Sequence, residues 1–363
     1  IDAAHERGLM VLLDVVYNHF GPDGNYLHAY APDFFTERHK TPWGAAVNYD
    51  GRGPGQESRW VREFVIHNAL YWLEEFRLDG LRLDAVHAIA DDSRPDVIEE
   101  LAARVASGPG RERHVHVVLE NDRNEARYLR ATQGRAVRCA AQWNDDFHHA
   151  CHVLATGETA GYYVAYADDP LRHLARCLTR GFAYQGEVFP YSGEHRGRPT
   201  DGVPLTAFLN FLQNHDQVGN RAFGDRLGAV ADRRRLALVT AIHLLAPSPP
   251  LLWMGEEWLA GTPFQYFCDF NPELAALVRN GRREEFARFP EFADPALREK
   301  IPDPAAPATF ARSKLDWAER GRTPHDGWLA TCTELLRRRR EHVVPRLASG
   351  VTSAEAQRPS ANE

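Results

Sequence analysis

Six short apolar runs rich in valine, isoleucine and leucine recur along the chain, and each is followed by a polar cluster and then by a stretch with helical spacing of its apolar residues. The runs are Met10 to Val16, Gly80 to Val86, Val115 to Leu119, Val137 to Trp143, Leu205 to Leu212 and Pro250 to Met254. Alternating patterns of this kind predict βα units in one parallel sheet, either an open doubly wound sheet or a closed barrel.

The polar clusters at the ends of the predicted strands distinguish these two folds. They are Asn18 and His19, Asp84, Glu120, Asn144 to Asp146, His215 and Asp216, and Glu256 and Glu257. A barrel places functional residues at the C-terminal ends of many strands, whereas an open sheet binds its ligand mainly at one switch point, usually with a glycine-rich phosphate loop. No GxGxxG or GxxxxGK[ST] motif follows any of the runs. The sequence therefore predicts an α/β fold of the (β/α)8 TIM barrel type.

Two long connections interrupt the regular pattern. Residues 20–60 are rich in glycine, proline and aromatic residues, and this segment is too long for an ordinary connection, so we expect it to cover the active face. The region Phe286 to Phe310 contains five prolines and predicts a second extended loop, followed by a helix from about Asp326 to His342. We assign 1–317 to the catalytic barrel, 318–350 to a C-terminal helical region and 351–363 to a polar tail or linker.

Charge and cysteine content exclude several classes of protein. The formal net charge is -7 and acids and bases are interspersed, so no basic face for nucleic acid is expected, and the basic run Arg337 to Arg340 is interpreted as a solvated helix end. No apolar stretch approaches the roughly 18 residues of a membrane span. The five cysteines are an odd number without CxxC spacing, which argues against disulfides or a zinc site. We expect a cytoplasmic protein without cofactor or metal.

Arg82, Asp84 and Glu120 have the properties of a catalytic group. Arg82 and Asp84 lie two residues apart on one predicted strand, so both side chains leave the same face, and the guanidinium keeps the carboxylate ionised and able to attack. Glu120 ends the next strand, where a like-charged neighbour would keep it protonated and able to donate. Two carboxyl groups in opposite protonation states are typical of glycoside hydrolysis. A single such pair is as often a structural ion pair, but six polar strand ends argue against that interpretation.

Further polar residues at the strand ends suit a sugar ligand. His215 and Asp216 add a donor and a third carboxylate, which could grip vicinal hydroxyls and stabilise an oxocarbenium-like transition state. Asn18 and His19 offer similar groups after the first strand. Asp14 suits substrate contact and a structural bond to Arg82 equally well.

Four segments containing these residues resemble the signature regions of the α-amylase superfamily, and they occur in that family's order. They are Asp14-Val-Val-Tyr-Asn-His19, Gly80-Leu-Arg-Leu-Asp-Ala-Val86, the strand ending in Glu120, and Gln213-Asn-His-Asp216. The resemblance implies that Asp84 is the nucleophile of a retaining glycosidase, Glu120 the general acid/base and Asp216 the transition-state stabiliser. It also implies that Arg82, His19 and His215 assist them.

Further motifs over nearly the whole chain resemble one subfamily, the malto-oligosyltrehalose trehalohydrolases. They are Leu119-Glu-Asn-Asp122, Ala141-Gln-Trp-Asn-Asp-Asp-Phe-His-His-Ala150, Gln217-Val-Gly-Asn-Arg221, Phe267-Cys-Asp-Phe270 and the region from Ile301 to Trp317. The resemblance implies hydrolysis of the α-1,4-glucosidic bond adjacent to the trehalose end of a malto-oligosyltrehalose, with release of trehalose. A malto-oligosyltrehalose synthase would act in the same pathway, with no physical contact implied.

The loop after the fourth run is the candidate for gripping the trehalose end. An aromatic face with amide and carboxylate groups around it suits a sugar, although Trp143 is equally suited to packing. His148 and His149 could be metal ligands, but no further ligands at suitable spacing appear. The complete predicted substrate-binding set is Asp14, Asn18, His19, Arg82, His87, Trp143, Asn144, Asp145, Asp146, His148, His215, Gln217 and Asn220.

The chain departs from the family pattern at its ends, where the first two barrel strands and the flanking β-domains are not found. We therefore expect a partial barrel whose unpaired strand edges make it fold poorly alone. Within the enzyme class, the alternative is a glucan branching or transglycosylating enzyme, which would share Asp84, Glu120 and Asp216. The remote alternative is an inactive amylase-like binding module, which would be free to lose any of the three. A retaining enzyme predicts a separation of about 5–5.5 Å between the Asp84 and Glu120 carboxyl groups.

Overall fold

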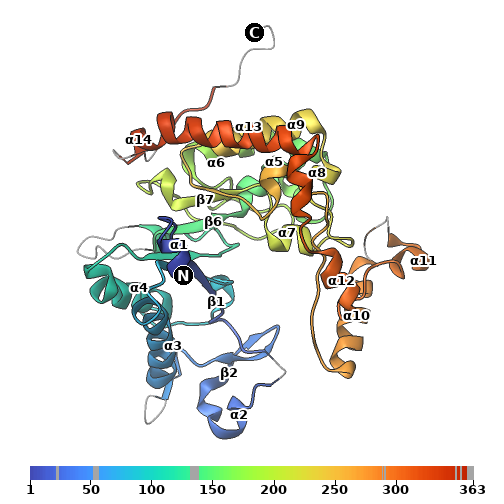
Figure 1. The fold of residues 1–363 in the computed structure, drawn as a ribbon. Coiled ribbons are helices and arrows are strands. Elements are labelled where there is room, and N and C mark those ends of the chain that lie inside the picture. Colours follow the sequence, from blue (N-terminus) through green and yellow to red (C-terminus); the bar gives the residue numbers. More distant parts are fainter. Residues whose placement is uncertain are drawn as a thin grey trace. The chain divides into compact units, whose positions relative to one another are not determined.

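The computed structural model describes residues 1–21, 24–51, 57–130, 139–287, 289, 292–347, 350–351 and 354–357 (Figure 1). The chain divides into two compact units. The first contains Ile1–Asn144, Arg180–Leu209 and Thr352–Glu355, and the second contains Asp145–Thr179, Asn210–Val351 and Ala356–Glu363. The two units are described separately below.

All six predicted strands are present and belong to one six-stranded sheet, in the order β1-β4-β5-β6-β7-β8. Their bounds are β1 Leu12–Val15, β4 Gly80–Leu83, β5 His116–Leu119, β6 Ala141–Asn144, β7 Phe208–Phe211 and β8 Pro250–Leu251. In the first unit, β1 pairs in parallel with β4, β4 with β5, and β5 with β6. In the second unit, the end of β7 pairs in parallel with β8. The parallel βα arrangement that the sequence predicts is confirmed.

The core of the first unit explains why its strands are short and apolar. The helices α3 (Glu57–Glu74) and α4 (Val97–Ser107) lie side by side (Figure 1) and, with the sheet, bury Ile66, Leu73, Leu81, Leu101 and Leu119. Gly80 begins β4 because a Cβ there would lie 2.3 Å from the carbonyl oxygen of His116. Close packing of this kind fixes the strands, and with them the side chains at the strand ends.

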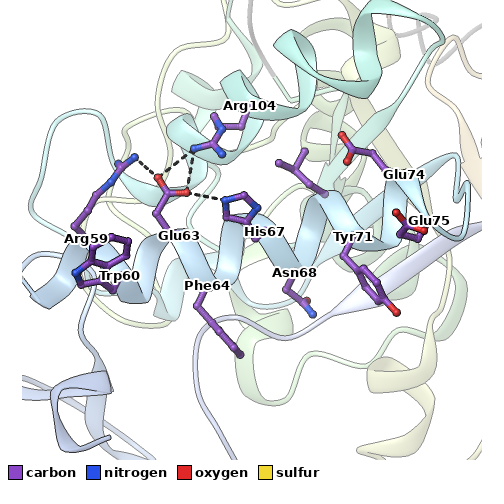
Figure 2. A pocket seen from close by; sticks show the side chains of 11 residues that line it. Arg59, Trp60, Glu63, Phe64, His67, Asn68, Tyr71, Glu74, Glu75 and Arg104 are labelled. Atoms are coloured by element: carbon purple, nitrogen blue, oxygen red, sulfur yellow. Dashed lines mark hydrogen bonds and ion pairs between the residues drawn. The ribbon is translucent and has the colours of Figure 1, made fainter.

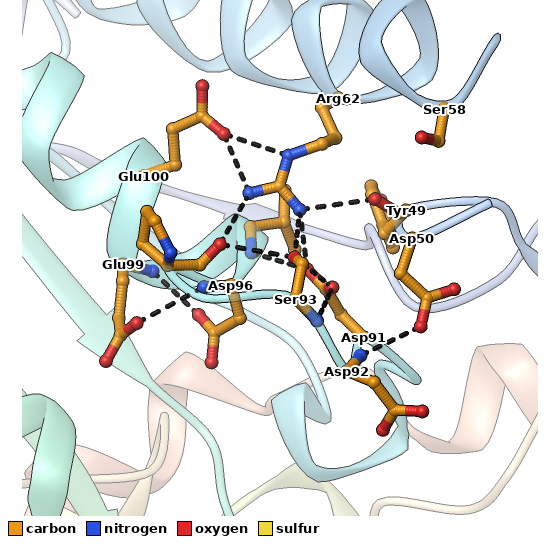
Figure 3. A network of polar contacts seen from close by, with 12 residues as sticks. Tyr49, Asp50, Ser58, Arg62, Asp91, Asp92, Ser93, Asp96, Glu99 and Glu100 are labelled. Atoms are coloured by element: carbon orange, nitrogen blue, oxygen red, sulfur yellow. Dashed lines mark hydrogen bonds and ion pairs between the residues drawn. The ribbon is translucent and has the colours of Figure 1, made fainter. Parts of the chain in front are cut away.

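A buried ionic network secures the segment that follows the predicted nucleophile (Figure 3). The Arg62 side chain on α3 is 8% exposed, and it pairs with Asp91 and Glu100, each at 2.7 Å. Arg62 also donates to the backbone carbonyls of Tyr49 at 3.3 Å and Pro95 at 3.0 Å. Because every one of these contacts is internal to the first unit, the network ties the long connection, α3 and α4 together.

The segment 20–60, predicted to be irregular, contains regular elements in its described part. These are α2 (Leu27–Tyr30) and an antiparallel hairpin of β2 (Phe35–Thr41) and β3 (Gly44–Val47). The prediction of an extended loop between 286 and 310 was also wrong in part, since α11 (Pro295–Arg298) and α12 (Pro307–Arg312) lie there. Both helices begin at a proline, whose fixed φ favours the first helical turn.

The second unit is mainly helical. Within it, α9 (Arg233–Leu245) packs against α5 (Asp145–Thr156) and α13 (His325–Arg338), and α13 continues into a π-helical turn, Arg339–Val343. The expected helix near 326–342 is therefore confirmed. The helices are α5 Asp145–Thr156, α6 Pro170–Arg180, α7 His215–Gly219, α8 Leu227–Val230, α9 Arg233–Leu245, α10 Pro272–Phe286, α13 His325–Arg338 and α14 Val344–Leu347, together with α11 and α12. At the other end of the chain, α1 (Asp2–His5) belongs to the first unit.

Arg339 corrects the prediction that the basic run lies on the surface. Arg337 and Arg338 are exposed and pair with Glu334, as expected of a solvated helix end. Arg339 is buried, and it donates to backbone carbonyls that follow α9, including those of Ala246 and, at 3.0 Å, Ser248. Its guanidinium therefore satisfies carbonyl groups at a helix C-terminus, where a cation is favoured.

In the part of the chain that the structure describes, no helix has both the length and the apolar character that crossing a membrane requires. Four of the five cysteines are buried. The assignment of 351–363 as a tail falls largely on residues outside the described ranges.

Candidate active site

Arg82 is the centre of the polar cluster at the C-terminal edge of the first unit's strands. Its side chain is 7% exposed, and Nη1 donates to Asp14 Oδ1 at 2.7 Å and to Asp84 Oδ1 at 2.8 Å. Nη2 lies 2.7 Å from Glu120 Oε2. Three carboxylates thus share one guanidinium, whose charge offsets part of their mutual repulsion. The Coulombic attraction of Glu120, Asp14 and Asp84 outweighs burial and raises the pKa of Arg82, so that this group stays charged.

The strand register explains how Asp84 and Glu120 come together. Arg82 is aligned with Asp14 on β1 and with Val118 on β5. The backbone ladder continues beyond the strands, because Asp84 donates to the carbonyl of Val15 and Glu120 donates to that of Leu83, both at 3.0 Å. The structure therefore brings the Asp84 and Glu120 side chains together at Arg82 in the first unit. Their expected carboxyl separation stays a prediction.

Ala85 connects the predicted nucleophile to the predicted acid. Its backbone is left-handed, with φ of 39°, a region that is unfavourable for a residue with a Cβ. In this conformation the Ala85 N–H donates to Glu120 Oε2 at 2.8 Å. Strain of this kind is typical of functional sites, and here it aims a backbone donor at the carboxylate.

Asn18 and His19 lie beside Asp84, but they differ in surroundings. Asn18 is buried and donates through Nδ2 to Asp84 Oδ2 at 3.2 Å and to the Asp84 carbonyl at 3.0 Å, so it orients the carboxylate. His19 contacts Asn18 and stacks on Trp43, with ring centroids 4.1 Å apart. Burial lowers the pKa of His19 despite the nearby charge of Asp84, which favours the neutral ring at neutral pH.

Trp143 and His87 complete the cluster in the first unit. The guanidinium of Arg82 lies 4.3 Å from the centroid of the Trp143 ring, a cation–π contact. His87 is partly buried, and its Nδ1 lies 3.4 Å from Asp122 Oδ1. Burial lowers the pKa of His87. Trp143 therefore packs on Arg82, and a contact with sugar remains a prediction for both residues.

The second unit holds the predicted third carboxylate. The Asn214 side chain caps α7 by accepting from the backbone N–H groups of Asp216 at 2.9 Å and Gln217 at 3.0 Å. The Asp216 side chain is about half exposed, and Oδ2 lies 3.4 Å from His215 Nε2. Asn220 is exposed at the C-terminal end of the same helix. The cap thus fixes the backbone at the start of α7, and with it the positions from which the side chains of Asp216 and Gln217 extend.

Two aromatic residues that contact predicted site residues, one in each unit, were not predicted. Trp43 stacks on His19, and it lies between β2 and β3 in the segment interpreted as irregular. Tyr162 donates to Gln217 Oε1 at 3.1 Å, and burial, together with the charges of Asp145 and Asp216, raises its pKa. Trp43 and Tyr162 were missed because neither residue follows a predicted strand directly. The run Tyr162-Tyr163 is the sequence feature that could have pointed to Tyr162.

The prediction that Asn144, Asp146 and His148 contact substrate is corrected, because all three side chains are buried. Asn144 donates to the Gly181 carbonyl at 2.7 Å, and Asp146 accepts from the Tyr166 hydroxyl at 2.5 Å. His148 contacts the Leu212 carbonyl at 2.6 Å and the Tyr163 hydroxyl at 3.0 Å. Burial lowers the pKa of His148 to about 3, so the neutral ring is structural. Asp145 is only partly buried and stays a candidate.

Two other features of the first unit, a groove and a cluster of polar side chains, lie apart from the candidate site. A groove of about 1060 Å³ runs along α3, where Trp60, Phe64 and Tyr71 are exposed (Figure 2), but none of the predicted catalytic residues lines it. His39, Asp50 and Asp92 form a cluster with metal-like spacing. Arg38 pairs with Asp50 at 2.9 Å and with Asp92 at 2.7 Å, so a cation is already present there.

Comparison with known proteins shows which proteins this chain resembles. The chain is 45% identical to a malto-oligosyltrehalose trehalohydrolase from Arthrobacter ramosus over 98% of its own length and 60% of the relative's. It is 38% identical to one from Saccharolobus solfataricus, over 87% of the chain and 52% of the relative. Over nearly its whole length, the chain is therefore similar to part of the proteins that bear the name malto-oligosyltrehalose trehalohydrolase. No family model matches the sequence.

A solved structure shows a similarity of the same extent. A crystal structure of an amylase-type protein from Salmonella typhimurium is 46% identical and has a TM-score of 0.88, over 97% of this chain and 58% of that one. The expected α-amylase type of α/β fold is thereby confirmed. The chain spans about 60% of the length of the Arthrobacter ramosus relative. The resemblance identified from the sequence motifs is therefore confirmed at the level of the family.

Proposed function

We propose that the protein carrying this chain is a retaining glycoside hydrolase that cleaves the α-1,4-glucosidic bond next to the trehalose end of a malto-oligosyltrehalose and releases trehalose. The observation that carries the proposal is the pair Asp84 and Glu120, both held by Arg82. The family gives the substrate class, since seven relatives that are 38–45% identical bear the name malto-oligosyltrehalose trehalohydrolase.

In the proposed reaction, a carboxylate oxygen of Asp84 attacks the anomeric carbon of the glucose next to trehalose. Glu120 gives its proton to the departing glycosidic oxygen, so that trehalose leaves and an ester of Asp84 forms. Glu120 then takes a proton from water, the hydroxide attacks the same carbon, and Asp84 leaves as the carboxylate. Asp216 accepts hydrogen bonds from sugar hydroxyls and stabilises the positive charge that develops at the anomeric carbon.

We propose roles for the remaining residues from their surroundings. Arg82 and Asn18 orient Asp84, because both donate to its carboxylate. His19 with Trp43, and His87, offer partly exposed rings for one part of the substrate. Asp145, His215, Gln217 and Asn220 offer polar groups for another part. Asp14 pairs with Arg82 through both of its oxygens, at 2.7 and 2.8 Å, which favours the structural interpretation of this residue.

Product analysis tests the proposed function. Incubated with maltotriosyltrehalose, the full-length protein is expected to release free trehalose and maltotriose, with little cleavage of maltopentaose in a parallel reaction. Chromatography of the sugars measures both. Equal cleavage of the two substrates would indicate a general amylase, and longer or branched glucans would indicate a transferase.

The transferase alternative has limited support. A 1,4-alpha-glucan branching enzyme from Thiobacillus denitrificans is 44% identical, but only over 24% of this chain. We also propose a reducing, cytoplasmic location, which an odd number of cysteines without CxxC spacing favours. A malto-oligosyltrehalose synthase would supply the substrate.

A further inference from the structure

Glu256 is a buried acid that the proposed reaction does not use. It begins a 3-10 turn, Glu256–Trp258, and residues 252–255 separate this turn from the end of β8 in the second unit. The residue is 7% exposed, whereas its neighbour Glu257 is only partly buried. A carboxyl group is rarely this buried without a charged partner, because removing the charge from water is costly.

One contact of Glu256 leads toward His215. Glu256 Oε2 accepts from the backbone N–H of Trp253 at 3.1 Å. The Trp253 ring in turn lies against His215, with ring centroids 5.9 Å apart, and against Phe264 at 5.0 Å. Because the backbone at Trp253 is anchored by Glu256, this contact fixes the surface on which His215 rests.

A second contact leads toward Asp216. Gln213 is buried beside Glu256, and its Oε1 already accepts from the Leu227 backbone N–H at 3.0 Å. The amide nitrogen of Gln213 is therefore the group that can donate to Glu256. The interaction between these two side chains lowers the pKa of Glu256. Gln213 immediately precedes Asn214, whose side chain caps the helix that carries Asp216. Glu256 is thus connected to His215 through Trp253, and to Asp216 through Gln213 and the Asn214 cap.

The surroundings of Glu256 favour its protonated form. Burial raises the pKa of Glu256 from 4.5 to about 8, against the lowering effect of the Trp253 N–H and Gln213. The charge of Glu257 also raises this pKa, and the guanidinium of Arg226 lowers it. Arg226 donates instead to the carbonyls of Met254 and Thr262, both at 2.7 Å. Cys332 on α13 is a further titratable group near Glu256, and burial raises its pKa to about 12, so it stays neutral below pH 10.

We propose that Glu256, carrying a proton, is a positioning residue that holds His215 and Asp216 in place through Trp253 and Gln213, and that its ionisation loosens them at alkaline pH. The proposal rests on the proposed function, in which Asp216 stabilises the transition state. A charged Glu256 would need hydration, and the two buried contacts are the ones that water would displace.

The substitution Glu256→Gln tests the proposal in the full-length protein, because glutamine has the shape of a protonated glutamate and cannot ionise. With maltotriosyltrehalose as substrate, kcat of E256Q is expected within about twofold of wild type at pH 7. Above pH 8 the ratio of mutant to wild-type kcat should rise, reaching about tenfold at pH 9, one unit above the midpoint. Glu256→Ala should lower kcat at every pH with a smaller effect on KM.

Glu257→Gln is the matched control, since it removes a neighbouring carboxylate that is only partly buried. This variant is expected to keep the alkaline transition, displaced slightly to lower pH, because the Glu257 charge raises the pKa of Glu256. An alkaline transition that E256Q retains unchanged would overturn the proposal. So would an E256Q variant as inactive as E256A at pH 7, since that result means the negative charge is needed.

Thermal unfolding at a series of pH values gives a readout that does not depend on activity. In wild type the unfolded chain ionises Glu256 near pH 4.5, whereas the folded protein keeps the proton until about pH 8. The stability of wild type relative to E256Q is therefore greatest at low pH, falls as pH rises through this window and is constant above it. If the difference in Tm between wild type and E256Q does not vary with pH, the inference that Glu256 carries a proton in the folded protein is wrong. If the wild-type protein releases no trehalose, the proposed function is wrong, and so is the positioning role that rests on it.

Discussion

Replacing Asp84 by asparagine is expected to lower kcat on maltotriosyltrehalose by about three powers of ten or more, while the protein stays folded. The amide has no negative charge and cannot form the ester intermediate. Its one oxygen can still accept the hydrogen bond from Arg82, and Asn18 keeps its hydrogen bond to the backbone carbonyl of residue 84, so the fold loses little. Glu120→Gln should have a loss of the same order, because an amide cannot deliver a proton to the departing oxygen.

Asp14→Asn is the matched control for these variants, because Asp14 shares the same guanidinium. Its side chain is 53% exposed, and no step of the proposed reaction passes through it, so we expect kcat to fall by about tenfold or less. Steady-state kinetics on variants with unchanged far-UV circular dichroism measure all three effects. An active, folded D84N protein would exclude Asp84 as the nucleophile.

Replacing Arg82 by methionine should affect stability and activity together. The substitution leaves Asp14, Asp84 and Glu120 without the cation that all three contact, and we expect a loss of about 3–5 kcal/mol in unfolding free energy, as for other buried pairs that lose one partner. Activity should fall by at least a hundredfold, because uncompensated repulsion between Asp84 and Glu120 would favour the uptake of a proton by the nucleophile. Denaturant unfolding and kinetics on the folded fraction separate the two effects.

Arg62→Met provides the comparison for Arg82→Met. Arg62 is equally buried and pairs with two carboxylates in the same unit, but it contacts no residue of the proposed reaction. We expect a similar loss of stability and a kcat per folded molecule near that of wild type. If R82M lost stability but retained full activity, the role of Arg82 would be purely structural.

The strands and the cluster around Asp84 could be predicted from sequence, because both depend on local patterns. Apolar runs of four or five residues must be buried on two faces, and parallel strands place their C-terminal residues at one edge. The hairpin β2–β3 was missed, since Phe35 to Val47 alternates weakly and is surrounded by glycine and proline. Tertiary packing rather than local propensity determines strands of this kind.

The prediction of a substrate-binding loop after the fourth apolar run was wrong for a different physical reason. The helix α5 begins at Asp145, directly after β6 ends at Asn144, so no loop separates the two elements. This helix is buried on nearly all sides from Asp146 to Val153, so the side chains of Asp146 and His148 lie in the interior. Burial of charged residues such as Glu256 and Arg339 could not be predicted either, because both lie among charged neighbours that suggest a surface.

The stereochemistry of the first product formed tests the central claim, a two-carboxylate retaining mechanism, most directly. Maltotriosyltrehalose is incubated with the full-length protein, and proton NMR spectra recorded during the first minutes follow the anomeric signals of maltotriose. Attack by Asp84 followed by attack of water inverts the anomeric carbon twice, so the account predicts that α-maltotriose appears first and mutarotates later. Initial formation of β-maltotriose would mean a single inversion and would contradict the assignment of Asp84 as nucleophile.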